Sequence, residues 1–211
     1  MPRVLAFRSC TLALCALAFT ACGGGGGASD PAPSSPTPIV VDLPLDLART
    51  GIASSNGQTQ SGQTLSVGDT ATNLTVKGIV TFSLSQIPAG ATIQVAGLRI
   101  SQVQVANAPY ATLGTVDVDH VDLLGALDAA DFGSVALAAA VATLSGSANL
   151  EVKVAEVTGR VVADIAAGRT VSSFRLQFGT GTDNDGADDV AILRGLNPGE
   201  EMVLRVSYLA P

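Results

Sequence analysis

Apolar and polar residues alternate along most of the chain after residue 39, which is the pattern of half-buried β-strands. Clusters of turn-forming residues such as Ser55-Asn56-Gly57 and Pro88-Ala89-Gly90 separate the alternating segments. The predicted strands are 49–53, 64–67, 76–84, 92–105, 115–120, 150–154, 173–178, 189–193 and 202–208. This succession of short strands predicts a mainly β protein.

One stretch in the second half of the chain changes from the strand period to the helix period. Thr158 is predicted to cap the N-terminus of a short helix over about 158–167, with Val157 and Val162 forming a hydrophobic staple. Gly168 is suited to the left-handed position that ends a helix. A single helix among many strands predicts an antiparallel β-sandwich with one helical plug.

Two segments are harder to interpret from their pattern. The apolar positions of the long strand after Thr92 change parity near Gly97, which predicts a β-bulge at that glycine. The segment Ala136–Leu144 has enough alanine to form a helix, yet its pattern fits a strand as well.

The N-terminus reads as an export signal, with a basic start and an apolar centre over residues 1–21. The segment Phe19-Thr20-Ala21-Cys22 resembles the lipobox of bacterial lipoproteins, in which the peptidase cuts before a cysteine that becomes lipidated. The alternative is an ordinary secretory signal with a chance cysteine. A Gly-, Pro- and Ser-rich tether over 22–38 favours the lipoprotein, because an anchored domain over 39–211 needs a flexible connection.

This leader predicts a location. We expect a protein attached through Cys22 to a membrane of the bacterial cell envelope. Gly23 in the second place resembles lipoproteins that are sorted to the outer membrane, where the domain would face the periplasm or the cell surface. The membrane is therefore an expected partner through the lipid anchor.

Composition narrows the class of protein further. Hydrophobic residues make up 47% of the chain and charged residues 14%, so a sizeable core can form. The net charge is −7, and without Arg3 and Arg8 of the leader 9 bases remain against 18 acids, or −9. This balance disfavours nucleic acid as a partner. Because Cys22 is the last cysteine, the domain has no disulfide and no thiol nucleophile.

The most concentrated group of candidate ligands is the segment DNDGADD over 183–189. Its carboxylates, Asp183, Asp185, Asp188 and Asp189, supply the hard oxygens that Ca²⁺ prefers. It is not an EF-hand, because aligning Gly186 with the sixth place puts glycine and isoleucine at the two end places. The alternative is a solvated acidic hairpin loop without an ion.

Other candidate chemistry is sparse, and no enzyme activity is expected. Strand alternation places His120, the only histidine, on the face opposite Asp117 and Asp119, so a hydrogen-bonded structural role is favoured over a metal site. The chain lacks a Gly-x-Ser-x-Gly elbow. It also lacks tryptophan, which leaves Tyr110 as the candidate platform for stacking on a sugar.

Several segments together resemble one family. The run VGDTATNLTVKGIVTFSLSQIPAGATIQVAGLRI over 67–100 is similar to the start of the DNRLRE-type β-sandwich domains, which are related to disaggregatase and alginate-binding carbohydrate modules. The segment Leu150–Gly168 resembles their strand-and-helix unit, and FRLQFGTGTDNDGADDV resembles a further family segment. The resemblance implies a jelly-roll-like sandwich, a strand for Ala136–Leu144, and a non-catalytic role at the cell surface. Lys77 stands where the family commonly has an arginine, which makes it a candidate ligand-binding residue.

These observations together predict a lipid-anchored envelope protein with a non-catalytic sandwich that binds an extracellular or envelope polysaccharide. Ca²⁺ is the candidate structural cofactor, and the alternative is a domain without a cofactor. The alternative is a structural or adhesive surface lipoprotein without a sugar ligand, and a polysaccharide-cleaving enzyme is a third hypothesis.

Overall fold

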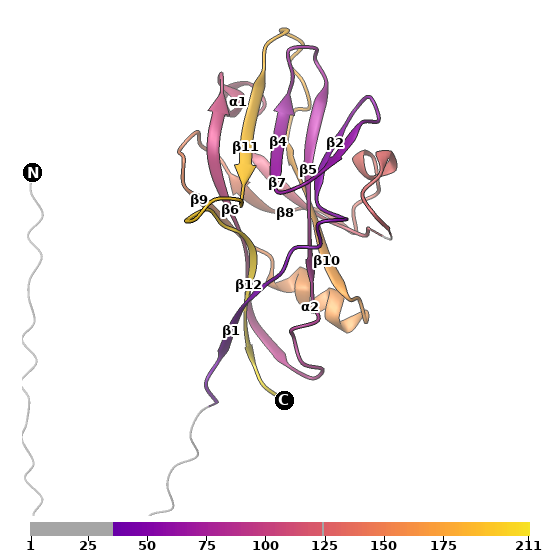
Figure 1. Ribbon diagram of the computed structural model, residues 1–211, viewed down its shortest axis with the longest axis vertical. Coiled ribbons are helices and arrows are strands. Elements are labelled where there is room, and N and C mark those ends of the chain that lie inside the picture. Colours follow the sequence, from indigo (N-terminus) through magenta and orange to yellow (C-terminus); the bar gives the residue numbers. More distant parts are fainter. Residues whose placement is uncertain (1–35, 124) are drawn as a thin grey trace, which may run out of the picture. The chain divides into compact units, whose positions relative to one another are not determined.

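The computed structural model describes residues 36–123 and 125–211, which form a unit over Pro36–Pro211 (Figure 1). The signal peptide, the lipidation site at Cys22 and the first part of the tether are predictions that lie outside the described residues. No helix in the described part of the chain has the length and apolar character needed to span a membrane.

The domain is mainly β, as the alternating pattern predicts. Its twelve strands are β1 (Ile39–Leu43), β2 (Gly51–Ser54), β3 (Thr59–Ser61), β4 (Thr64–Asp69), β5 (Thr75–Ser83), β6 (Thr92–Ala106), β7 (Val116–Val121), β8 (Ala138–Ser145), β9 (Val152–Glu156), β10 (Val171–Phe178), β11 (Asp189–Arg194) and β12 (Met202–Leu209). The helical elements are α1 (Pro109–Thr112), the 3₁₀ turn η1 (Ala129–Phe132) and α2 (Thr158–Ala166).

All strand pairs are antiparallel, in the order β1-β12-β6-β11-β4-β5-β10-β7-β8. β2 pairs with β5, β3 with β2, and β9 with β6. β6 therefore has three partners: it pairs with β12 in its first part, with β11 in its last part, and with β9 along its other edge. The result is the predicted antiparallel sandwich, in which one sheet folds over on itself.

The core lies between the facing parts of this sheet. Its largest members come from several strands and include Phe82, Leu98, Phe174 and Leu204, which are all fully buried. Full burial of a side chain of this size stabilises the folded state by about 1.5–3 kcal/mol relative to exposure. Each strand therefore has a strong preference for which of its two faces lies in the core.

The bulges of β6 do not lie at Gly97, so that prediction is wrong. Gly97 pairs directly with Arg205 and with Glu156. The register instead shifts where Ser207 and Tyr208 of β12 meet β6, which leaves Gln94 as the extra residue. The parity change read from the sequence is real, but it occurs three residues earlier.

α2 forms where predicted, but it begins differently. Thr158 is the first helical residue rather than the cap, and its Oγ1 accepts a hydrogen bond from the backbone N–H of Ala96 in β6 at 2.8 Å. Val162 is 43% exposed while Val157 is buried, so the predicted staple does not form. The predicted cap was wrong because a tertiary donor takes the Thr158 hydroxyl.

The end of α2 matches the prediction. Gly168 has a φ of +69°, its N–H donates to the Ile165 carbonyl at 3.0 Å, and Arg169 N–H donates to the Asp164 carbonyl at 2.9 Å. This pair of bonds is a Schellman motif, and its left-handed position favours glycine. The closed end of the helix fixes Asp164 and Arg169, whose side chains enter a buried network described below.

The two ends of the described chain lie at one end of the sandwich. Figure 1 shows the start of β1 and the C-terminus at the lower end, while the turn between β4 and β5 and the start of β11 lie at the upper end. β6 connects the two ends, because Thr92 pairs with Leu209 and Ala106 pairs with Val190.

Candidate metal centre

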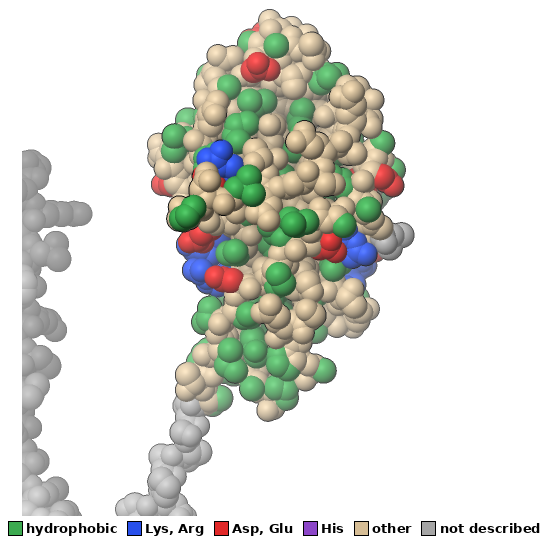
Figure 2. All heavy atoms as spheres, viewed as in Figure 1, with side chains coloured by type: hydrophobic (Ala, Val, Ile, Leu, Met, Phe, Trp, Pro, Cys, Tyr) green, Lys and Arg blue, Asp and Glu red, His purple; other side chains and the backbone are tan. Residues whose placement is uncertain are grey.

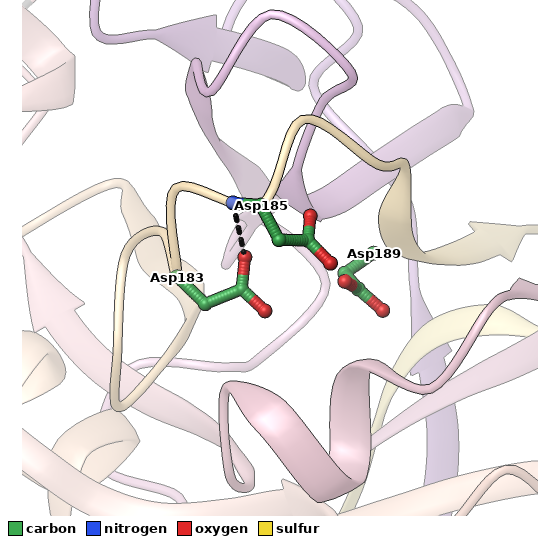
Figure 3. Close-up of side chains that lie close together, drawn as sticks. All are labelled: Asp183, Asp185 and Asp189. Carbon is green, nitrogen blue, oxygen red and sulfur yellow. Dashed lines mark hydrogen bonds between the residues drawn. The ribbon is translucent and has the colours of Figure 1, made fainter.

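The acidic segment predicted from the sequence lies in the loop between β10 and β11, at the upper end of the domain in Figure 1. Asp183, Asp185 and Asp189 each offer a carboxylate oxygen, and these oxygens lie within 4.8 Å of one another. Figure 3 shows the three side chains directed toward a shared space. Asp189 is buried at the start of β11, whereas Asp185 is exposed.

Local hydrogen bonds shape this loop. Asp183 Oδ1 accepts from the N–H of Asp185 at 3.2 Å, and Asp185 Oδ1 accepts from the N–H of Ala187 at 2.7 Å. Asn184 and Gly186 have positive φ values of 62° and 76°. Aspartate, asparagine and glycine tolerate such turns, so the DNDG sequence itself brings the first two carboxylates together.

The loop is held by two neighbouring turns. The N–H of Gly186 donates to Asn73 Oδ1 at 3.0 Å, in the turn between β4 and β5. Asp189 Oδ1 accepts from the N–H of Ala108 at 2.9 Å, just before α1. The position of the buried Asp189 is therefore fixed from outside its own loop.

Asp188, the fourth predicted ligand, is not among the converging carboxylates. Its Oδ1 accepts from the N–H of Ala71 at 2.8 Å, and its backbone carbonyl accepts from Asn107 Nδ2 at 3.0 Å. Asp188 thus fastens the loop to its neighbours, while the structure brings together the other three predicted residues.

A further carboxylate, Asp69 at the end of β4, lies beneath the loop and was missed by the sequence analysis. It is the direct cross-strand partner of Asp189, and both residues are buried, at 0% and 2% exposure. Asp69 Oδ2 accepts from the Thr182 hydroxyl and from the N–H of Asp183. Among the described residues no donor reaches Asp69 Oδ1. The only sequence signal is an aspartate at the end of a strand, and the register that pairs it with Asp189 cannot be read from the chain.

The other buried acids have cationic partners. Asp119 accepts from Arg175 Nη2 at 2.8 Å and from Gln177 Nε2 at 2.9 Å, and its Oδ1 accepts from the N–H of Ala140. The last bond fixes an irregular position in β8, where Ala140 has a φ of +47°. Both oxygens of Asp119 are engaged within the fold, which gives this network a structural role, although the buried Nε of Arg175 has no partner among the described residues.

The only histidine lies in a second buried network. His120 Nε2 is 2.9 and 3.0 Å from the carboxylate oxygens of Asp164, which also accepts from the Ser172 hydroxyl at 2.6 Å. Arg169 Nε lies 3.3 Å from the same carboxylate and its guanidinium also pairs with Asp122. His120 and Asp119 therefore have separate partners, as strand alternation predicts, and His120 has the expected hydrogen-bonded role.

The two residues proposed from sequence as ligand contacts are engaged within the domain. Lys77 Nζ donates to the backbone carbonyl of Phe132 at 3.1 Å and lies 4.3 Å from the centre of the Phe132 ring. Burial, with a smaller effect from Arg175, lowers the pKa of Lys77. The ammonium group is therefore used to hold η1 against β5.

Tyr110 is half-buried rather than fully exposed. Its hydroxyl donates to Gln102 Oε1, and its ring packs edge-on against Phe178 at a centroid distance of 5.2 Å. Burial raises the pKa of Tyr110. A stacking platform needs an open ring face, and these contacts limit how much of the ring a sugar can cover.

Comparison with known proteins adds no family assignment. The chain matches no protein-family model and no curated protein. Three convergent carboxylates, one of them buried, form an oxygen-rich site of the kind that holds a hard cation.

The buried histidine network yields a stability prediction. Asp164→Ala should lower the free energy of unfolding by about 3 kcal/mol or more, because it leaves buried His120 and Ser172 without their partner. Asp122→Ala removes the other partner of Arg169 at the surface and should cost less than about 1 kcal/mol. Urea unfolding of both variants tests this difference, and equal losses would contradict it.

Proposed function

We propose that the protein is a lipid-anchored component of the bacterial cell envelope whose β-sandwich is a non-catalytic module stabilised by Ca²⁺. The observation that carries the calcium assignment is the convergence of Asp183, Asp185 and Asp189 without a positively charged partner among the described residues. Like charges this close repel one another unless a cation or solvent relieves them.

Calcium suits the site better than magnesium does. Ca²⁺ accepts six to eight oxygen ligands in flexible geometry, whereas Mg²⁺ requires a near-ideal octahedron and dehydrates reluctantly. The ligands here come from a loop and from the start of a strand, and Asp185 is exposed, so water can complete the shell. A larger ion with an adaptable shell is therefore the better fit.

A structural or adhesive role is the favoured use of this module. The side chains that would bind a sugar, Lys77 and Tyr110, are engaged by Phe132, Gln102 and Phe178. The ion would instead stiffen a group of loops at the end of the domain opposite to the start of β1. Rigid loops at that end are suited to contacts with neighbouring molecules.

Polysaccharide binding is the second candidate, and one cleft favours it. An open cleft of about 420 Å³ lies between β8 and the start of α2, with Glu156, Thr158 and Arg160 among its lining residues. Carboxylate and guanidinium groups bind neighbouring hydroxyls through paired hydrogen bonds, which is how polar sites orient a sugar. This cleft is separate from Lys77 and Tyr110.

The calcium proposal predicts a metal-dependent stability. Ca²⁺ at a hundredfold excess over its Kd should raise the free energy of unfolding of EDTA-treated protein by about 2.7 kcal/mol. The double variant Asp183→Asn/Asp185→Asn should lose most of this gain, because it keeps one oxygen of each side chain but removes two charges from the site. Thermal melts in EDTA, Ca²⁺ and NaCl of matched ionic strength measure the gain in stability for both proteins.

Two controls separate ion binding from screening. Asp122→Asn removes a charge beside Arg169, outside the acidic loop, and should keep the full response to Ca²⁺. NaCl at matched ionic strength should stabilise much less than Ca²⁺ if the ion is bound in the site. Equal melting temperatures in all three solutions would leave the segment as a solvated acidic loop.

The anchor predicts a covalent modification at Cys22. Wild-type protein should incorporate a radiolabelled fatty acid in a bacterial host, and Cys22→Ser should not, because the thiol is the acceptor of the lipid. The calcium response of the domain should be the same in both, since the domain residues are unchanged. Equal labelling of the two proteins would refute the anchor.

The polysaccharide candidate makes a different prediction. Arg160→Ala should weaken retention in affinity gels containing acidic or neutral polysaccharides by about tenfold, because a charged hydrogen-bond donor is lost from the cleft. Arg205→Ala, which removes a surface partner of Asp42, is the matched control. Absence of retention of the wild type in every gel would favour the structural or adhesive role.

A further inference from the structure

The four buried aspartates of the described residues divide into two kinds. Asp119 is paired with Arg175, and Asp164 is paired with His120 and Arg169. Asp69 and Asp189 have no ion-pair partner in the described part of the chain. These two are also the ones that face each other directly across β4 and β11.

This pairing brings two carboxyl groups together away from water. Side chains at directly opposed positions have Cβ atoms about 4.5–5.5 Å apart, and like charges there destabilise a sheet. The residue before Asp69 must be glycine, because Gly68 has a φ of +137° and a Cβ there would lie 2.0 Å from the carbonyl oxygen of Asp189. Neither aspartate can reach bulk water, so some other group must offset their charge.

The hydrogen bonds of Asp69 satisfy only one of its oxygens. Oδ2 accepts from Thr182 and Asp183, which are residues of the acidic loop itself. Oδ1 is buried and has no donor among the described residues. A buried acceptor without a partner costs roughly 1–3 kcal/mol and more when charged, so such an oxygen needs an explanation.

The loop also lacks a ligand that comparable loops contain. With Gly186 at the sixth place of a calcium loop, Asp183 and Asp185 take the third and fifth places, and the first place is the glycine at position 181. Asp69 lies next to that gap, because it bonds Thr182 and Asp183 directly. Asp69 of β4 thus places a carboxylate near the first position of the loop, where the loop itself has a glycine.

We infer that Asp69 is a fourth, buried carboxylate ligand of the proposed calcium ion, which therefore links β4 to β11 and to the acidic loop. The inference rests on the proposed function, since it assigns a ligand to the same site. Asp69 lies outside the group of carboxylates whose oxygens are within 4.8 Å of one another, so binding requires its side chain to turn toward Asp183, Asp185 and Asp189. An ion bound in this way would neutralise the opposed pair Asp69 and Asp189 together with the loop carboxylates. It would also couple the exposed loop to the sandwich core.

The variant that tests this is Asp69→Asn, which keeps the size and one acceptor oxygen and removes the charge. Calorimetric titration with Ca²⁺ should give an affinity about tenfold to a hundredfold below that of the wild type. The melting temperature without calcium should be unchanged or higher, because an unneutralised buried charge has been removed. Circular dichroism confirms that the variant is folded.

Asp188→Asn is the matched control, because it removes one charge from the same loop at an exposed carboxylate that accepts a hydrogen bond from the Ala71 N–H. Its calcium affinity should fall by less than about threefold, since only a longer-range attraction is lost. If Asp69 were only a hydrogen-bond acceptor for Thr182 and Asp183, Asp69→Asn would match Asp188→Asn in affinity. That result would overturn the inference and leave the proposed function standing.

A wild type that binds no Ca²⁺ would overturn the proposed metal site itself. A crystal of the wild-type protein grown with Ca²⁺ answers the question without any variant. A distance of about 2.3–2.6 Å between the ion and a carboxylate oxygen of Asp69 would support the inference. An ion bound to Asp183, Asp185 and Asp189 alone would contradict it.

Discussion

Backbone pairing along β6 is the constraint on which the rest of the sandwich depends. This strand extends over Thr92–Ala106, about 50 Å at the usual rise per residue, and pairs with β12, β11 and β9. Its bulge at Gln94 turns Ala96, Leu98 and Ile100 toward the core. Because strand register fixes which side chains face inward, a slip here would expose the apolar residues of several neighbours.

The buried aspartates are the second feature that organises the domain, and they lie in two kinds of surroundings. Near α2 and η1, each buried acid meets a guanidinium or imidazole and several hydrogen-bond donors, as Asp119 and Asp164 do. At the loop end, the donors that Asp69 and Asp189 meet in the described part of the chain are backbone N–H groups and one hydroxyl. Because the fold supplies Asp119 and Asp164 with cationic partners, the contrast favours a cation from solution beside Asp69 and Asp189.

The sequence predicts most of the strands because apolar alternation is a local property. It misses β1 and β3: β3 is exposed throughout, and β1 is largely so. The strand β8 was open to two interpretations, since its alanines give no clear period and its pairing with β7 is irregular. The Thr158 cap failed for a related reason, because a donor from distant β6 takes its hydroxyl.

The residues of the candidate site also differ in how far the sequence predicts them, depending on whether local or tertiary structure places them. Asp183 and Asp185 are close in sequence, so the turn that brings them together could be predicted. Asp188 and Asp189 are neighbours in the chain, yet Asp188 faces the turn at Ala71 and Asp189 faces the carboxylates of Asp183 and Asp185. Asp69 was not predicted, because its place beside Asp189 depends on the β4–β11 register, which is a tertiary property.

The arrangement of the chain ends has a practical consequence for engineering. The start of β1 and the last residue lie at the same end of the domain (Figure 1). The acidic loop, the β4–β5 turn and the segment before α1 lie together at the other end, one face of which is shown in Figure 2. Attachment to a bead, a chip or a fused protein at either terminus would therefore leave those loops accessible. The fold could serve as a display scaffold in which randomised loop residues face outward and the attachment chemistry never competes with them.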